Sequence, residues 1–295
     1  MNGDLETLMK KLLPTILFCT CSTAVLAEGS PWVPGDGESR VCAELLTGSS
    51  DKFFIGDVST NLGGDIEGTF LWLNGAYGYD DRWAFDVRTG YAQSQFETNP
   101  VEQEDISDTS IGVSYQLLNE FEADNGLPTV TVRAGITVGG DYETDVIDAI
   151  GDGASGLDLS LLVGKSLTNQ FSVSGDLTFR QRNEDVADAV KYLVTGFYST
   201  PLPGLGLRLS VGGSRTDSDV NIGDPGFGVE QFPQTDRDLD VVIGGANYGF
   251  ENGIGLSLSY VALVDGTNVS DTDVTTFSLS YSCLLYTSPS PRDRG

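Results

Sequence analysis

The sequence predicts an all-β fold, an antiparallel up-and-down β-barrel of about twelve strands, on three observations. Apolar and polar residues alternate with period 2 along most of the chain; in residues 171–180, Phe171, Val173, Leu177 and Phe179 fall on one side. Long connections alternate with tight ones. Aromatic residues gather near the ends of the alternating segments. Together these features are typical of a transmembrane β-barrel.

The N-terminal residues 1–27 have the pattern of a secretory signal. Lys10 and Lys11 precede the apolar run 12–26, and Val25-Leu26-Ala27 offers small residues at the cleavage positions. A transmembrane anchor is the alternative, but the run is short and Pro14 interrupts it. We therefore expect cleavage after Ala27 and export to the outer membrane of a Gram-negative cell.

Residues 28–38 precede the first alternating segment. Trp32 stands between Pro31 and Pro34 there. Such a segment suits either a plug in the periplasmic mouth or a short periplasmic lead into the first strand, and we favour the lead.

The barrel is expected over residues 39–282. Its predicted strands lie near residues 39–47, 66–79, 83–97, 107–120, 128–142, 156–167, 171–183, 189–200, 205–218, 239–250, 254–265 and 274–282. The first is the weakest prediction, because residues 52–60 could form the strand instead of residues 39–47.

The predicted connections fall into two sets. The long, acidic ones are 48–65, 98–106, 143–155, 184–188, 219–238 and 266–273, and the short ones between them are 80–82, 121–127, 168–170, 201–204 and 251–253. Short periplasmic turns and long external loops produce this alternation in outer-membrane barrels. In lipid, the apolar strand faces are required, and closure leaves no free edge.

The last thirteen residues, 283–295, break the alternation. Phe277, Leu279 and Tyr281 occupy alternate positions, but Cys283 stands where outer-membrane barrels commonly carry the terminal aromatic residue that the assembly machinery recognises. Residues 283–293 match the in-frame translation of a transposon-based sequencing adapter. We therefore interpret residues 283–295 as read-through and not as native sequence.

Composition excludes several classes of protein. The 16 Lys and Arg against 43 Asp and Glu argue against nucleic acid as a partner. The chain has no His, which removes His-dependent hydrolases and His-liganded metal sites. We expect no enzyme and no cofactor. Carboxylates with glycine, as in residues 151–153, would suit calcium, but without a calcium-loop spacing a solvated acidic surface is favoured.

Charged residues at the polar positions of the strands are candidates for lining the lumen. They are Asp86, Arg88, Arg133, Asp158, Asp176, Arg180, Arg208 and Asp240. Facing Arg and Asp groups would form a constriction that selects solutes by charge and size, or would neutralise one another and fill the barrel. The sequence leaves both roles open.

Three stretches together resemble the outer-membrane barrels grouped as the transporter family of the meta-pathway of phenol degradation. They are residues 31–38 (PWVPGDGE), residues 77–83 (YGYDDRW), and residues 107–118 (SDTSIGVSYQLL) with 127–133 (LPTVTVR). The resemblance implies a porin-like channel that passes small molecules, including hydrophobic or aromatic compounds. The alternative is a non-conducting structural or surface-interaction barrel that uses its acidic external loops. Expected partners are outer-membrane lipid, the assembly machinery acting on the C-terminal strand, and a small-molecule solute.

Overall fold

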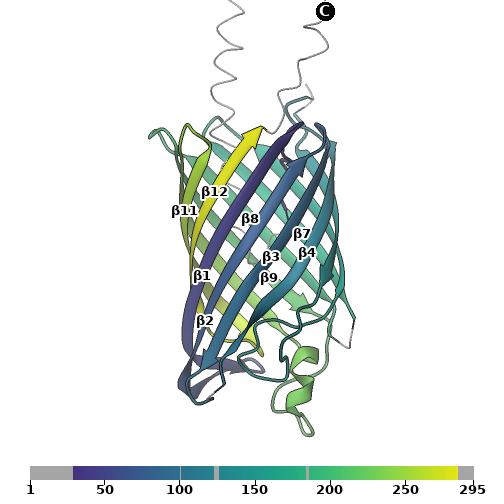
Figure 1. Cartoon of the computed structure of the whole chain (residues 1–295), viewed down its shortest axis with the longest axis vertical. Coiled ribbons are helices and arrows are strands. Elements are labelled where there is room, and N and C mark those ends of the chain that lie inside the picture. Colours follow the sequence, from purple (N-terminus) through teal and green to yellow (C-terminus); the bar gives the residue numbers. More distant parts are fainter. Residues whose placement is uncertain (1–28, 100, 123–125, 184–185, 285–295) are drawn as a thin grey trace, which may run out of the picture.

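A computed structural model describes residues 29–99, 101–122, 126–183 and 186–284, which form a closed barrel of twelve antiparallel strands (Figure 1). The strands are β1 (Glu38–Ile55), β2 (Val58–Gly78), β3 (Trp83–Phe96), β4 (Gln103–Leu118), β5 (Thr129–Val138), β6 (Gly156–Ser166), β7 (Phe171–Arg182), β8 (Ala189–Ser199), β9 (Leu205–Thr216), β10 (Asp238–Gly249), β11 (Ile254–Thr267) and β12 (Asp273–Leu284). A short 3-10 helix, η2 (Val229–Gln234), lies between β9 and β10. The predicted fold class is confirmed.

Each strand pairs with its neighbours in the sequence, and β1 pairs with β12 to close the sheet. The closing register runs from Glu38 opposite Leu284 to Ser49 opposite Asp273. Cys283 and Leu284 therefore belong to β12, whereas the predicted signal (residues 1–27) and residues 285–295 lie outside the described residues. Closure pairs every strand on both sides, so no sheet edge remains exposed.

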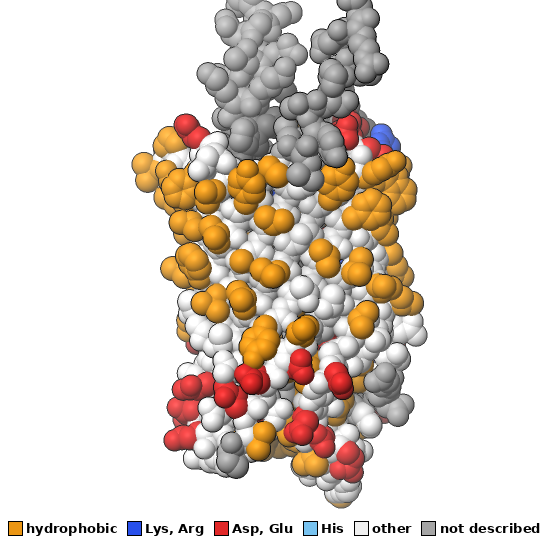
Figure 2. Space-filling view, in the orientation of Figure 1, with side chains coloured by type: hydrophobic (Ala, Val, Ile, Leu, Met, Phe, Trp, Pro, Cys, Tyr) orange, Lys and Arg blue, Asp and Glu red, His pale blue; other side chains and the backbone are white. Residues whose placement is uncertain are grey.

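The two ends of the barrel differ. The start of β1, the end of β12 and the short connections lie at the end drawn uppermost in Figure 1, which we call the turn end. The long connections and η2 lie at the opposite end, which we call the loop end. Acidic side chains gather toward the loop end, below a barrel wall covered with apolar side chains (Figure 2).

The strands alternate with polar residues inside and apolar residues outside. In β5, Thr129 and Thr131 are fully buried, whereas Ile136 and Val138 are about half exposed. A soluble protein would show the opposite distribution, because water favours burial of apolar side chains. The wall of this barrel is therefore built to contact an apolar solvent.

Aromatic pairs surround the turn end. Trp83 packs against Tyr115 with ring centroids 4.6 Å apart, and Phe171 packs against Tyr198 at the same separation. All four residues lie at the turn-end termini of their strands. Such rings suit the interface between lipid and water.

The predicted loop at residues 48–65 is wrong. β1 and β2 continue through it and are joined by a tight turn at Gly56 and Asp57, where Gly56 takes a positive φ of 55°. β1 therefore contains all of residues 39–47 and the first part of 52–60, with a register shift between Ser50 and Lys52. The polar, acidic composition of this stretch favours a loop, but its Gly-Asp pair also suits a hairpin turn, and the structure has the turn.

The strand predicted at residues 128–142 ends earlier, at Val138, and residues 139–155 cross the loop end. Within this connection Ile150 and Ala154 are buried, and the backbone N–H of Phe96 on β3 donates to Asp148. No helix in the described part of the chain is long and apolar enough to cross a membrane.

Candidate functional site

The N-terminal segment enters the lumen at the turn end. The carbonyl oxygen of Pro31 accepts hydrogen bonds from Gln116 on β4 (3.1 Å) and Thr131 on β5 (2.8 Å). Trp32 packs edge-on against Phe197 of β8. The description of residues 28–38 as a periplasmic lead is therefore wrong for residues 29–35. These residues form a plug. The alternation of polar and apolar residues in the strands does not predict its position, because the plug is held by contacts across the barrel.

Glu120, just after β4, fixes this plug. Its buried carboxylate accepts hydrogen bonds from Nε1 of Trp32 (3.1 Å) and from the backbone N–H of Ser166 (2.9 Å). The ammonium group of Lys165 lies 3.5 Å away. Room for the plug comes from Gly164, where a Cβ atom would lie only 2.7 Å from Pro31.

Arg133 and Asp86 form a two-pronged ion pair at the inner end of the plug. Nη2 and Nε of Arg133 donate to Asp86 at 2.6 and 3.0 Å, and the Arg133 side chain is 1% exposed. Gly112 and Gly135 make space for this guanidinium, because a Cβ at either position would come within 2.8 Å of it. Both predicted residues thus lie inside the barrel, in contact with each other.

A second predicted pair lies nearer the loop end. Nε of Arg180 on β7 donates to Asp158 on β6 at 2.6 Å, and Thr137 on β5 donates to the same carboxylate at 2.9 Å. Asp176 is also inside the barrel and accepts a hydrogen bond from Thr178 at 2.9 Å.

Arg88 and Arg208 lie close to a charged residue that the sequence analysis missed. Glu44 of β1 is fully buried, within electrostatic reach of both arginines, and accepts a hydrogen bond from Asn74 at 3.3 Å. The guanidinium carbon of Arg88 lies 4.0 Å from the ring centroid of Trp72. Glu44 continues the inward positions of its strand, so the alternation around it was the available signal.

Asp240 does not line the lumen, so this prediction is wrong. It accepts hydrogen bonds from Arg215 (2.7 Å) and Tyr192 (2.5 Å), which share the outward-facing side of their strands. The inward positions beside it on β10 are Val241 and Ile243, which are buried and apolar. The polarity of Asp240 therefore predicted the wrong face of β10, because the inner face is apolar there and the outer face carries the exposed ion pair between Asp240 and Arg215.

The loop half of the lumen holds a charged group that spans three segments. The guanidinium of Arg182 at the end of β7 lies 3.6 Å from Asp108 on β4 and 3.4 Å from Asp152 in the 139–155 connection. Asp108 also accepts a hydrogen bond from the hydroxyl of Tyr142 at 2.5 Å. Burial and the Asp108 carboxyl raise the pKa of Tyr142, so its hydroxyl remains a neutral donor.

Arg237, just before β10, approaches the same group. Its Nη2 donates to the carbonyl oxygen of Phe232 at 3.0 Å and its Nε to the hydroxyl of Thr235 at 3.3 Å. Burial alone would raise the pKa of Asp152, but Arg182 and Arg237 outweigh it and hold that pKa below its ordinary value. Asp152 is therefore an anion facing two cations.

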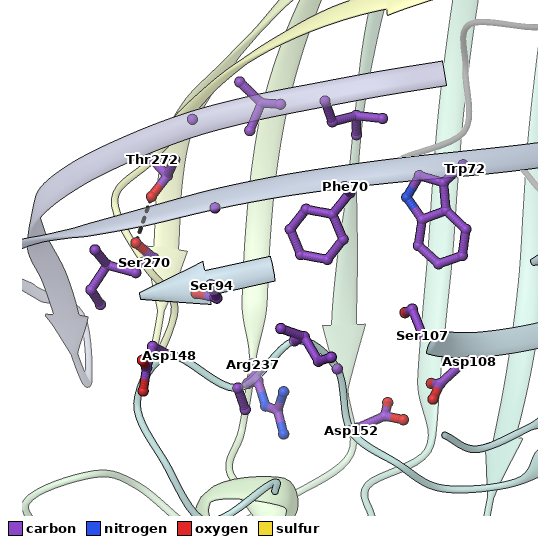
Figure 3. Close-up of a pocket in the computed structure, with 18 of the residues that line it drawn as sticks. Phe70, Trp72, Ser94, Ser107, Asp108, Asp148, Asp152, Arg237, Ser270 and Thr272 are labelled. Carbon is purple, nitrogen blue, oxygen red and sulfur yellow. Dashed lines mark hydrogen bonds between the residues drawn. The ribbon is translucent and has the colours of Figure 1, made fainter. Parts of the chain in front are cut away.

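A cavity of about 510 Å³ lies beside this group. Figure 3 shows Phe70 and Trp72 of β2 on one side and Asp148, Arg237 and Asp152 on the other. The two rings are nearly parallel, with centroids 6.4 Å apart. A cavity of this size matches typical small-molecule pockets, which range from roughly 300 to 1,000 Å³.

Sequence reasoning missed most of this cavity. Arg182 and Asp108 continue the inward positions of β7 and β4, so alternation could have found them. Asp148, Asp152 and Arg237 lie in connections, where no periodicity indicates direction. In the residues that the structure describes, no three Cys, Asp or Glu side chains are grouped so as to hold a metal ion.

Comparison with solved structures shows what the fold is similar to. The COG4313 outer membrane channel from Pseudomonas putida F1 superposes with a TM-score of 0.68 at 14% identity, covering 88% of this chain and 100% of that one. The translocator domain of autotransporter NalP from Neisseria meningitidis gives 0.49 at 13% identity, over 95% of this chain and 96% of that one. The KdgM porin gives 0.45 at 7% identity, over 81% and 98%.

The first of these likenesses shows a shared barrel fold. No family model and no curated protein sequence matches this chain. Its resemblance to the phenol meta-pathway transporter family therefore stays a prediction.

Proposed function

We propose that the chain is an outer-membrane channel for passive passage of small molecules. One observation carries the proposal: a closed barrel with an apolar outer wall encloses a lumen lined by charged and hydroxyl side chains, with a cavity of about 510 Å³ inside. Lipid requires such a wall, and a polar lumen suits a route for solutes. We propose no enzymatic role, because known barrel hydrolases use a catalytic His and this chain has none.

The orientation follows from the two ends. We assign the turn end, with its short connections, to the periplasm and the loop end, with its acidic connections, to the outside. The aromatic pairs Trp83–Tyr115 and Phe171–Tyr198 would then lie at the periplasmic interface. Lipid and the barrel assembly machinery remain the proposed partners.

Aromatic or hydrophobic compounds are the proposed solutes. Phe70 and Trp72 line the cavity, and Leu46, Ile66 and Val274 add to its apolar lining. Apolar side chains along a cavity favour solutes that bury apolar surface.

The proposal is tested by conductance in a planar bilayer. The chain from residue 28 onward would be refolded, checked for heat-modifiable migration, and measured at high and low salt. We expect discrete steps whose ion selectivity changes on Arg133→Ala or Arg208→Ala, because both side chains lie inside the barrel. Arg215→Ala is the matched control, since Arg215 lies on the outer wall.

A non-conducting surface barrel is the second candidate, and the plug favours it. Residues 29–35 occupy the turn half of the lumen, where Pro31 bonds to β4 and β5 and Trp32 bonds to the connection between those two strands. A folded barrel that never conducts, even after residues 29–35 are deleted, would contradict the channel and support the surface role. If the barrel conducts only after residues 29–35 are deleted, the channel proposal stands and the plug is what closes the lumen.

A further inference from the structure

We propose that the loop-half cavity binds a small aromatic carboxylate that carries a ring hydroxyl, with the carboxylate on Arg237 and the hydroxyl on Asp148. The inference rests on the proposed function, since the ligand would be the solute or one class of it. The proposed ligand is more narrowly defined than the hydrophobic or aromatic solutes named above, because it must carry both a carboxylate and a hydroxyl group.

The first argument is the charge of Arg237. Its hydrogen bonds go to a carbonyl and a hydroxyl oxygen, and among the described residues no carboxylate lies within 4.0 Å of its guanidinium. Asp152 acts on it electrostatically but not by contact. Arg182, by comparison, lies within that distance of both Asp108 and Asp152.

A partly buried guanidinium with neutral contacts favours an anionic ligand. Desolvation of a charged group is costly unless a counter-ion in hydrogen-bonding distance offsets it. Arginine also presents a planar fork of N–H donors that matches the two oxygens of a carboxylate. Arg237 lines the cavity directly, so an anion there can reach it.

The second argument is the opposite side of the cavity. Phe70 and Trp72 occupy consecutive inward positions of β2 and their rings are nearly parallel, 8° apart. Figure 3 shows both rings across the cavity from Arg237. A flat aromatic ring in the cavity would bury apolar surface against Phe70 and Trp72 while its acid group reached the guanidinium.

The third argument is Asp148. It is 2% exposed, and its Oδ2 accepts a hydrogen bond from the backbone N–H of Phe96, whereas its Oδ1 has no hydrogen-bond partner among the residues that the structure describes. A buried acceptor without a donor is unfavourable, and a ligand hydroxyl would satisfy it. Asp148 lines the same cavity, on the same side as Arg237 in Figure 3.

The acidic loop surface does not contradict an anionic ligand. Surface charges are screened beyond about 8 Å at physiological ionic strength. The cavity itself is lined by Arg88, Arg180, Arg182 and Arg237 against Asp108, Asp148 and Asp152. The local balance therefore does not exclude a carboxylate.

The test is titration calorimetry on the refolded chain in detergent with four probes: 4-hydroxybenzoate, benzoate, phenol and benzylamine. We expect 4-hydroxybenzoate to bind most tightly and benzylamine most weakly. Arg237→Gln should weaken 4-hydroxybenzoate at least about tenfold and leave phenol nearly unchanged, since a charge-assisted contact contributes on the order of tenfold or more. Arg215→Gln is the matched control and should change the affinity for neither 4-hydroxybenzoate nor phenol.

Asp148→Asn tests the contact with the ligand hydroxyl, and Trp72→Leu tests the contact with the ligand ring. Asp148→Asn should reduce the preference for 4-hydroxybenzoate over benzoate, and Trp72→Leu should weaken every aromatic probe. If Arg237→Gln fails to fold, Arg237→Lys and the salt dependence of binding to the unaltered chain serve instead. Equal affinities of benzoate and benzylamine, or unchanged 4-hydroxybenzoate binding on loss of the Arg237 charge, would overturn the inference.

Conductance distinguishes failure of this site from failure of the channel. Binding with the expected variant pattern but without conductance would retain the site and overturn the channel. Conductance without binding of any probe would retain the channel and overturn the site.

Discussion

The two halves of the lumen both contain buried arginine and aspartate side chains, but these side chains are paired differently. In the turn half, Arg133 meets Asp86 directly, and the plug fills the space beside them. In the loop half, Arg237 contacts only neutral oxygens among the described residues, and a cavity of about 510 Å³ remains beside it. The difference teaches that pairing, and not the presence of charge, separates groups that build the barrel from groups available to a ligand.

The largest effect is expected from breaking the Arg133–Asp86 pair. Asp86→Ala removes the carboxylate that accepts hydrogen bonds from two nitrogens of Arg133, and losing one member of a buried ion pair costs about 3–5 kcal/mol. The measurement is urea unfolding in detergent, followed by tryptophan fluorescence. The double variant Asp86→Ala/Arg133→Ala should recover part of the loss. Equal losses in the single and double variants would show that the pair is not the cause.

Removing the plug's aromatic anchor should have a smaller effect. Trp32→Ala removes the contact with Phe197 and the hydrogen bond to Glu120. Because Trp32 is only partly buried, we expect a loss of roughly 2 kcal/mol, below the range for a fully buried tryptophan. Susceptibility of the N-terminal segment to protease should rise at the same time. Unchanged proteolysis would mean that the segment is held without Trp32.

Acid should release the connection at residues 139–155 from the loop half of the lumen. The pKa of Asp152 is held below its ordinary value of 3.8, so its ionised form stabilises the folded connection above that pH, and this contribution is lost as pH falls through the lower, folded value. Pepsin cleavage within residues 139–155 should therefore begin only below about pH 4. Asp152→Asn should remove this pH dependence and be cleaved at higher pH. Cleavage of the unaltered chain already at pH 5 would contradict the assignment.

The smallest effect is expected on the outer wall. Arg215 and Asp240 form an ion pair of 2.7 Å with both side chains more than a third exposed. Exposed pairs contribute about 0–1 kcal/mol, so Asp240→Ala should change the unfolding free energy by less than about 1 kcal/mol. Urea unfolding beside Asp86→Ala tests this directly. A loss as large as that of Asp86→Ala would mean that Asp240 is not on the exposed face.

Prediction of the site from sequence succeeded where alternation applied. Arg133 and Asp86, and likewise Asp158 and Arg180, lie at polar positions of regular strands and meet inside the barrel. It failed at Asp240, because Val241 and Ile243 form an apolar patch on the inner wall there. It also failed at residues 48–65, where a short turn at Gly56 and Asp57 was hidden in an acidic stretch.

The sequence by itself determined the twelve-stranded, all-β character of the chain, because period-2 alternation is a local property of neighbouring residues. Only the tertiary structure decided that residues 29–35 enter the lumen and that Arg237 and Asp148 face the same cavity as Phe70 and Trp72. These relations join connections to strands far away in sequence. Connections have no repeating backbone geometry that would fix where a side chain points, so the closed barrel had to bring them together.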